Sequence, residues 1–305
     1  MKFGFLTVPF NTSSLNEVSE WAVSESFEAL EIACWPRQND MVERRYAGTS
    51  HIDIENITSN EASEISQYLE EMGLEISGLG FYPNPLHPDP IHRQKIIQNI
   101  KNLIKCASWM GVPIVNTFCG GDSNLTVDGN WENAKKIWPE LIAYSQDLGV
   151  QIAFENCPMI FSENEWPAGH NIAYSPHIWR RIFDNWDGGV RINLDPSHLI
   201  WQMIDQTKFI REFGNYICHV HAKDLKIDLD GLYEYGIMST GIGWQIPKIP
   251  GLGDVNWSTF FSELTKVGFS GPVILEHEDR DYEGSLELIK EGLILARQNL
   301  YKYID

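Results

Sequence analysis

Cysteine is scarce in this 305-residue sequence, and no two cysteines stand in CxxC spacing. The five that occur are scattered along the chain: Cys34, Cys106, Cys119, Cys157 and Cys218. An odd, dispersed set without a signal peptide is typical of reduced thiols in the cytoplasm. We therefore expect a cytoplasmic protein whose cysteines act mainly as small buried apolar side chains.

Long apolar runs and basic charge are also scarce. No stretch approaches 18 consecutive apolar residues, so no segment is expected to cross a membrane. Lys and Arg number 23 against 42 Asp and Glu, which gives a formal net charge of −19. A surface that acidic repels phosphate backbones, and nucleic acid is therefore not an expected partner. Hydrophobic residues make up 43% of the chain, as in ordinary globular domains.

What the sequence does contain is a regular alternation of short β-rich runs and amphipathic helical stretches. The expected strands are 3–8, 29–33, 75–80, 114–118, 151–155, 191–195, 217–221 and 273–276. The clearest helices are 14–26, 59–72, 90–110, 131–148, 257–267 and 284–301. Glycines suited to a left-handed helix end follow four of them: Gly73, Gly111, Gly149 and Gly268. Repeated βα units of this kind indicate a parallel sheet.

Eight such units predict an α/β fold of the closed (β/α)8 type, the TIM barrel. A doubly wound sheet is the competing fold, but it normally carries a glycine-rich phosphate loop after the first strand. Here PFNTSS follows instead. No linker divides the chain, so we expect a single domain over residues 1–305. The longest expected loops, 34–56, 81–89, 120–130, 156–174 and 223–256, all follow strands and so lie on the C-terminal face.

Four ionisable residues stand at the ends of the last four expected strands. They are Glu155 in IAFEN, Asp195 in RINLDPSH, His221 in CHVHAKD and Glu276 in VILEHED. Any one of them is readily explained as a salt-bridge partner or a helix N-cap. Buried together at one rim, they require a positive partner, and they match a divalent-metal site. The oxygen-rich set favours Mn2+ or Mg2+, with Co2+ and Zn2+ as alternatives.

Further candidates surround these four residues. His198 and Asp224 follow the same strands, and with Trp35 they are candidate substrate contacts. His219 shares the inward face with His221, because side chains alternate along a strand, and it is either a substrate or supporting contact or a packed core histidine. His170 is either an extra acid/base or a solvated loop residue. The aromatic loops carry Trp166 and Trp244 as well as Trp35, and Arg280, in the segment DRDYEG after the last strand, is a further candidate substrate contact.

The segments AFEN, DPSH, HVHAKD and PGLGDVNW…GFSGPVILEHED resemble the xylose-isomerase-like TIM-barrel superfamily, the sugar phosphate isomerase/epimerase group. That group includes tagatose 3-epimerase, inosose dehydratase and endonuclease IV, and the resemblance covers essentially the whole chain. It implies metal binding by Glu155, Asp195, His221 and Glu276, and acid/base roles for the two glutamates. It also implies that His198 touches a substrate oxygen. The sequence departs from the epimerases at Asn156, where they often have Pro, and in the insert that follows.

These observations predict a metal-dependent sugar isomerase or epimerase that abstracts a proton next to the carbonyl of an unphosphorylated keto sugar or cyclitol. The alternative is a lyase that eliminates water or an aglycone from a 3-oxo-glucoside. Relatives with that activity work with a small second subunit, so a small partner subunit is one expectation for this chain. A homo-oligomer is the alternative. An abasic-site nuclease would need more histidine ligands and a basic groove, which the acidic charge opposes. A non-catalytic sugar-binding barrel is the third reading.

Overall fold

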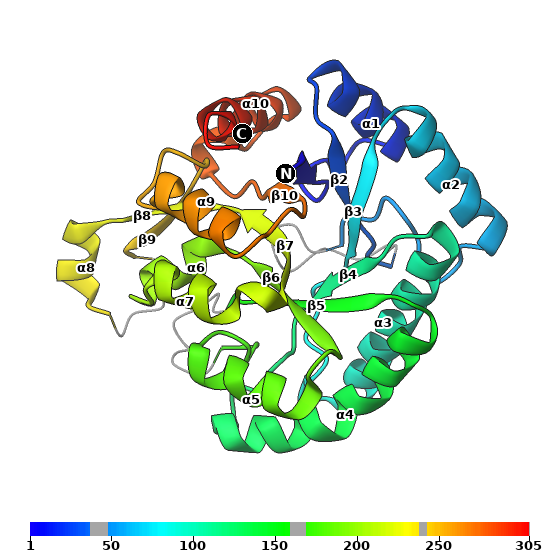
Figure 1. The fold of residues 1–305 in the computed structure, drawn as a ribbon, viewed down its shortest axis with the longest axis horizontal. Helices are drawn as coiled ribbons and strands as arrows, with labels where there is room; N and C mark the ends of the chain where they lie inside the picture. The colour runs from blue at the N-terminus through cyan, green and yellow to red at the C-terminus, as the bar shows by residue number, and fades with distance from the viewer. Residues whose placement is uncertain (37–47, 159–168, 238–242, 305) are drawn as a thin grey trace.

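Eight parallel strands close into a barrel in the computed structural model, which describes residues 1–36, 48–158, 169–237 and 243–304 (Figure 1). Their order around the barrel is β1-β10-β7-β6-β5-β4-β3-β2, and every neighbouring pair is parallel. The strands are β1 (Phe3–Leu6), β2 (Ala29–Ala33), β3 (Glu75–Gly80), β4 (Ile114–Thr117), β5 (Gln151–Glu155), β6 (Val190–Leu194), β7 (Ile217–Ala222) and β10 (Val273–Leu275). The predicted (β/α)8 barrel is confirmed.

Helices connect the strands on the outside of the barrel. They are α1 (Leu15–Ser24), α2 (Ser59–Glu71), α3 (Pro90–Met110), α4 (Val127–Asp147), α5 (Pro176–Trp186), α6 (Pro196–Trp201), α7 (Gln206–Phe213), α9 (Trp257–Lys266) and α10 (Leu286–Tyr301). The four glycines expected at helix ends all have positive φ, between 68° and 77°. At the other end, Ser14 and Thr58 form capping boxes with Glu17 and Glu61. The local signals therefore fixed these helix boundaries to within a few residues.

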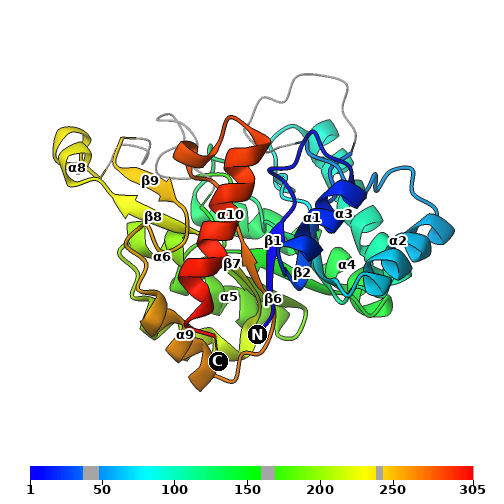
Figure 2. The same cartoon turned by 90° about the horizontal axis from the view of Figure 1, so that it is seen from above.

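The segment after β7 corrects one prediction. Residues 223–256 were expected to form a loop, but they contain an antiparallel pair of strands, β8 (Asp224–Ile227) and β9 (Gln245–Lys248), and the short helix α8 (Leu229–Tyr235). Figures 1 and 2 show this arm projecting from the barrel. Its elements are only four to seven residues long.

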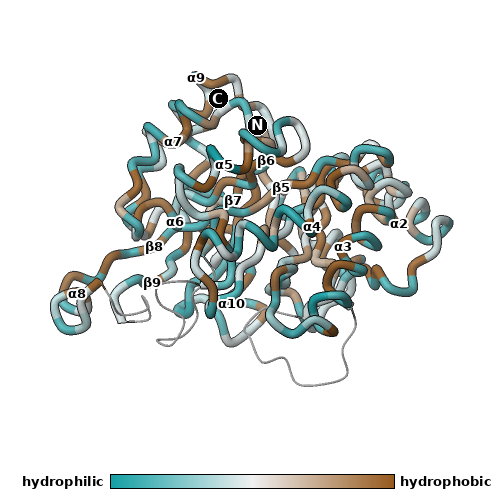
Figure 3. The backbone as a smooth tube through the Cα atoms, turned by 90° about the horizontal axis from the view of Figure 1, so that it is seen from below, coloured by the Kyte–Doolittle hydropathy of each residue, from teal (hydrophilic) through white to brown (hydrophobic). Residues whose placement is uncertain are grey.

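The core lies between the barrel strands and the inner faces of the helices. Trp138, Trp179, Phe5, Phe154 and Phe260 are among its largest fully buried side chains. In Figure 3 hydrophobic and hydrophilic stretches alternate along the helices, as expected for helices that bury one face. All five cysteines are free thiols, three of them buried. Within the described ranges no helix is long and apolar enough to span a membrane.

Gly4 gives a test of how tightly the barrel closes. A Cβ at this position would lie 2.1 Å from the backbone oxygen of Ala29, in the adjacent strand. We expect Gly4→Ala to lower the free energy of unfolding by at least about 1–3 kcal/mol, because backbone cannot move aside as a side chain can. Urea unfolding measures the change.

Gly73→Ala is the matched control. Nothing lies within 4 Å of the added methyl group, and only the positive φ of 76° opposes it. Its expected cost is about 1 kcal/mol. Equal stability of Gly4→Ala and the wild-type protein would contradict this account of barrel closure.

Candidate active site

The carboxyl ends of four neighbouring strands bring the candidate metal ligands to one rim of the barrel. Glu155 is the last residue of β5, and Asp195 follows β6 directly as the N-cap of α6. His221 lies in β7, and Glu276 follows β10. Because β10, β7, β6 and β5 are adjacent and parallel, their C-terminal ends lie at the same rim of the barrel.

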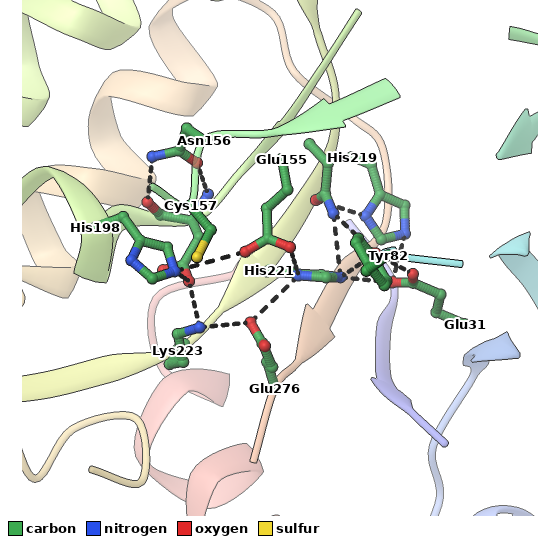
Figure 4. Close-up of polar contacts among 12 residues, drawn as sticks. Glu31, Tyr82, Glu155, Asn156, Cys157, His198, His219, His221, Lys223 and Glu276 are labelled. Atoms are coloured by element: carbon green, nitrogen blue, oxygen red, sulfur yellow. Dashed lines mark hydrogen bonds and ion pairs between the residues drawn. The ribbon is translucent and has the colours of Figure 1, made fainter. Parts of the chain in front are cut away.

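Three of these side chains form one compact group (Figure 4). Nδ1 of His221 lies 3.3 Å from Oε2 of Glu276 and 3.6 Å from Oε2 of Glu155. Candidate ligand atoms of the three residues all lie within 4.8 Å of one another. Among the described residues, Nδ1 of His221 and Oε2 of Glu276 are buried without a hydrogen-bond partner. One imidazole nitrogen and two carboxylates in this arrangement suit a divalent cation.

Asp195 is directed to a different neighbour. Its Oδ2 lies 3.0 Å from Nζ of Lys223 and 3.1 Å from Nε2 of His198. Lys223 also approaches Oε2 of Glu276 to 3.1 Å and Oε2 of Glu278 to 3.4 Å. The lysine therefore connects Asp195 to the other three candidates. Lys223 is a candidate functional residue that the sequence analysis did not name, although a lysine directly after a buried strand was a usable signal.

The two glutamates of the compact group have different environments. Burial alone would raise the pKa of Glu155, but the nearby imidazoles of His198 and His221 and the charge of Lys223 hold it well below its ordinary value. Burial raises the pKa of Glu276, and Lys223 offsets this only in part because the negative charge of Glu155 adds to it. Two carboxyl groups whose pKa values are driven apart are suited to complementary acid and base roles.

A carboxylate on the other side of the His221 imidazole was also not predicted from the sequence. Oε2 of Glu31, in β2, lies 2.6 Å from Nε2 of His221, and the hydroxyl of Tyr82 donates a hydrogen bond to the same carboxylate. Glu31 is completely buried in the strand ALEIA. A charged residue in an otherwise apolar strand is rare without a partner, and this signal was present in the sequence.

Two asparagines fix the strand ends. The amide of Asn156 donates to the backbone oxygen of Asp195, and its oxygen accepts from the Asp195 backbone N–H. The Asn171 amide donates to the backbone oxygens of Glu155 and Cys157. The position where the chain departs from the epimerase pattern thus positions Asp195, a task that the proline ring, which lacks hydrogen-bonding groups, cannot perform.

Two candidate substrate contacts lie close to this group. His198 stands 3.6 Å from Oε1 of Glu155 and is only partly buried. Trp35 packs against Tyr82, with ring centroids 5.9 Å apart. Both positions are compatible with the predicted substrate contact, which stays a prediction.

The other proposed contacts are placed elsewhere. His219 is fully buried, and its ring nitrogens face Asn193 at 2.9 Å and Ser77 at 3.2 Å, which favours the packed core histidine.

Arg280 is exposed in the short helix η3 (Arg280–Tyr282), without an ion pair in the described part of the chain. The pKa of His87 is lowered mainly by burial and in part by the charge of His170. His170 therefore lies near His87. Trp244 is completely buried, and Trp166 lies outside the described residues.

The structure gives Asp224 a different role from the predicted substrate contact. Its carboxylate accepts hydrogen bonds from four backbone N–H groups and from Nε1 of Trp257, at 2.8–3.2 Å. The backbone donors are Leu225, Gly251, Gly253 and Val255. With five donors on two oxygens, Asp224 holds the PGLGDVNW segment in place and has no capacity left for substrate.

Comparison with known proteins places this geometry in a family. The family described as xylose isomerase-like TIM barrel matches residues 20–298. The chain belongs to this family. An uncharacterized Bacillus subtilis protein, YfiH, is 25% identical over 92% of this chain and 93% of its own length.

Solved members of the fold superpose over the whole barrel of this xylose isomerase-like protein. The D-psicose 3-epimerase of Clostridium cellulolyticum H10, solved with D-tagatose, has a TM-score of 0.69 at 16% identity and covers 100% of both chains. The IOLI protein, solved with a bound zinc atom, has a TM-score of 0.70 at 16% identity, again over 100% of both chains. At such identities the likeness concerns the fold.

Asp224→Asn tests the correction. Its amide group would face backbone donors in place of a carboxylate oxygen, so we expect a loss of roughly 1–3 kcal/mol in unfolding free energy. Asp254→Asn is the control, because that exposed carboxylate accepts only from Ile227 N–H among the contacts seen. Chemical denaturation checks both. A destabilisation no greater than that of the control would speak against the structural role.

The burial of His219 should make the stability of the protein depend on pH. Burial lowers the pKa of His219 to about 4, from an ordinary value near 6.5. The unfolded chain therefore takes up the proton first, and stability should fall as pH decreases from about 6.5 to 4. His219→Gln should flatten this slope in urea titrations between pH 4.5 and 7.5. An identical slope in the variant would remove His219 as its cause.

Proposed function

We propose that this protein is a divalent-metal-dependent isomerase or epimerase acting on an unphosphorylated keto sugar or cyclitol. The observation that carries the proposal is the group formed by Glu155, His221 and Glu276, whose buried ligand atoms face one another at one point. The solved epimerase with D-tagatose and the zinc-containing IOLI protein share the barrel and support this assignment by analogy.

The residues fit a metal on the chemistry of their donor atoms. Glu155, His221 and Glu276 would hold it. Asp195, whose carboxylate contacts Lys223 in this structure, would be a fourth ligand. The oxygen-rich set favours Mn2+, with Mg2+, Co2+ or Zn2+ as alternatives. Bound there, the cation supplies Lewis acidity that makes the hydrogen next to a substrate carbonyl more acidic.

The remaining work falls to the side chains of this chain. Glu155, whose pKa is held low, is the base that takes the proton from carbon. Glu276, which faces Glu155 across Nδ1 of His221, is the acid that returns a proton to the substrate. His198 reaches a substrate oxygen from beside Glu155, and Trp35 with Tyr82 forms an aromatic wall against the sugar. Return of the proton on the opposite face of the same carbon gives epimerisation.

The test is solvent exchange. The protein is incubated with Mn2+ in D2O with a panel of ketohexoses, inososes and 3-oxo-glucosides, and NMR follows deuterium incorporation. We expect incorporation without loss of a group, abolished by a chelator and restored by Mn2+. Glu155→Gln and Glu276→Gln should each slow it by at least about 100-fold, because each removes one proton carrier.

Glu263→Gln is the control, because that buried carboxylate is bonded to Arg211 and Lys266 on the outer helices. It should leave exchange unchanged. Exchange that persists in both active-site variants would refute the acid/base roles. Release of water or of an aglycone would instead establish the lyase reaction. Tight sugar binding without exchange would mark a binding protein.

A further inference from the structure

His221 is held between two different environments. On one side, Nδ1 faces Glu155 and Glu276, the candidate metal ligands. On the other side, Nε2 lies 2.6 Å from Oε2 of Glu31, closer than to its other polar neighbours, the side-chain amide of Asn193 at 3.1 Å and the hydroxyl of Tyr82 at 3.3 Å. Among the residues that the structure describes, Glu31 is the carboxylate nearest to Nε2, since Glu155 and Glu276 come closest to His221 at Nδ1. The imidazole therefore links a carboxylate from β2 to the group formed by β5 and β10.

We propose that Glu31 is a positioning residue that keeps Nε2 of His221 protonated and so directs the lone pair of Nδ1 toward the metal. This inference rests on the proposed function of the site. A neutral imidazole carries one proton, and the nitrogen that hydrogen-bonds to a carboxylate retains it. Metal-binding histidines are commonly oriented by a carboxylate in this way, which fixes the tautomer and increases the basicity of the ligand nitrogen.

The surroundings of Glu31 hold it in this role. The Tyr82 hydroxyl donates to Oε1 of Glu31, leaving Oε2 for the imidazole. Gly80 leaves room for the carboxylate, since a Cβ there would lie 2.6 Å from Oε1. Among the described residues, no lysine or arginine lies within ion-pair distance of Glu31, and only the two histidines do. A buried carboxylate of this kind needs a positive partner, and a metal-bound imidazole provides one.

A metal bound directly by Glu31, His219 and His221 is the competing explanation, because the three residues also lie close together. The distances oppose it. Two ligands at about 2 Å from one ion in a tetrahedral arrangement lie farther apart than the 2.6 Å between Glu31 and His221. His219 also has both ring nitrogens within hydrogen-bond distance of Asn193 or Ser77.

The experiment measures binding of Mn2+ or Zn2+ alone to the metal-free full-length protein, by calorimetry and by competition with a chelator. Glu31→Gln keeps the shape of the side chain but removes its charge. We expect one ion per wild-type chain and about 10–100-fold weaker binding by Glu31→Gln. Tyr82→Phe, which leaves the carboxylate but removes its hydrogen bond, should weaken binding by a smaller factor.

Two further measurements separate positioning from mere stability. Glu263→Gln, which removes a buried carboxylate outside the site, should leave metal affinity at the wild-type value. In the Zn2+-loaded protein, proton and nitrogen NMR should show a strongly hydrogen-bonded Nε2–H of His221 in the wild type, and a more weakly bonded one in Glu31→Gln.

The outcomes separate this inference from the proposed function. Wild-type protein that binds no ion would overturn both. Wild-type protein that binds an ion with the same affinity as Glu31→Gln would overturn the role of Glu31 alone. A second ion that disappears in Glu31→Gln would establish direct ligation by Glu31 in place of positioning. Should Glu31→Gln not fold, unchanged affinity in Tyr82→Phe would overturn the inference.

Discussion

The cost of burying negative charge at one rim of the barrel governs the structure of the site. Glu31, Glu155 and Asp195 are almost entirely removed from solvent, and Glu276 is mostly so. Their positive partners among the described residues are Lys223 and the histidines that can take up a proton. Buried carboxylates in such numbers destabilise a fold unless a cation and fixed hydrogen bonds compensate them. The asparagine contacts to the strand ends and the barrel register keep the compensating groups in place.

Strand β7 and Lys223, the residue that follows it, supply most of this compensation through the two-residue alternation of side chains along an extended chain. His219, His221 and Lys223 follow one another at this spacing and extend from the packed interior to the rim. His219 is enclosed by polar core groups, His221 joins the carboxylates, and Lys223 connects Asp195 to Glu276. The next residue, Asp224, instead binds the backbone of the segment that precedes α9. One short motif therefore combines the centre of the site with an anchor for its surrounding loop.

The barrel was predictable from sequence because its signals are local. Helix-ending glycines, capping residues and apolar periodicity each act within a few residues, and parallel topology then places every strand end on one face. Glu155, His221 and Glu276 were found by this rule. Glu31 and Tyr82 were not, because Glu31 lies in the middle of β2 and Tyr82 lies two residues beyond β3, so neither stands directly at the end of a strand. Asp224 was misassigned because the spacing of its motif does not reveal that five donors converge on it.

Lys223 orients two of the candidate metal ligands, Asp195 and Glu276. A single ammonium group lies 3.0 Å from Asp195 and 3.1 Å from Glu276, so both carboxylates already turn toward one positive charge. A divalent cation among Glu155, His221 and Glu276 would find its ligands oriented, and little side-chain entropy would remain to be lost on binding. The positive charge of Lys223 between Asp195 and Glu276 limits the repulsion between these two carboxylates. Orientation by Lys223 in front of the imidazole and by Glu31 behind it thus constrains the site from both sides.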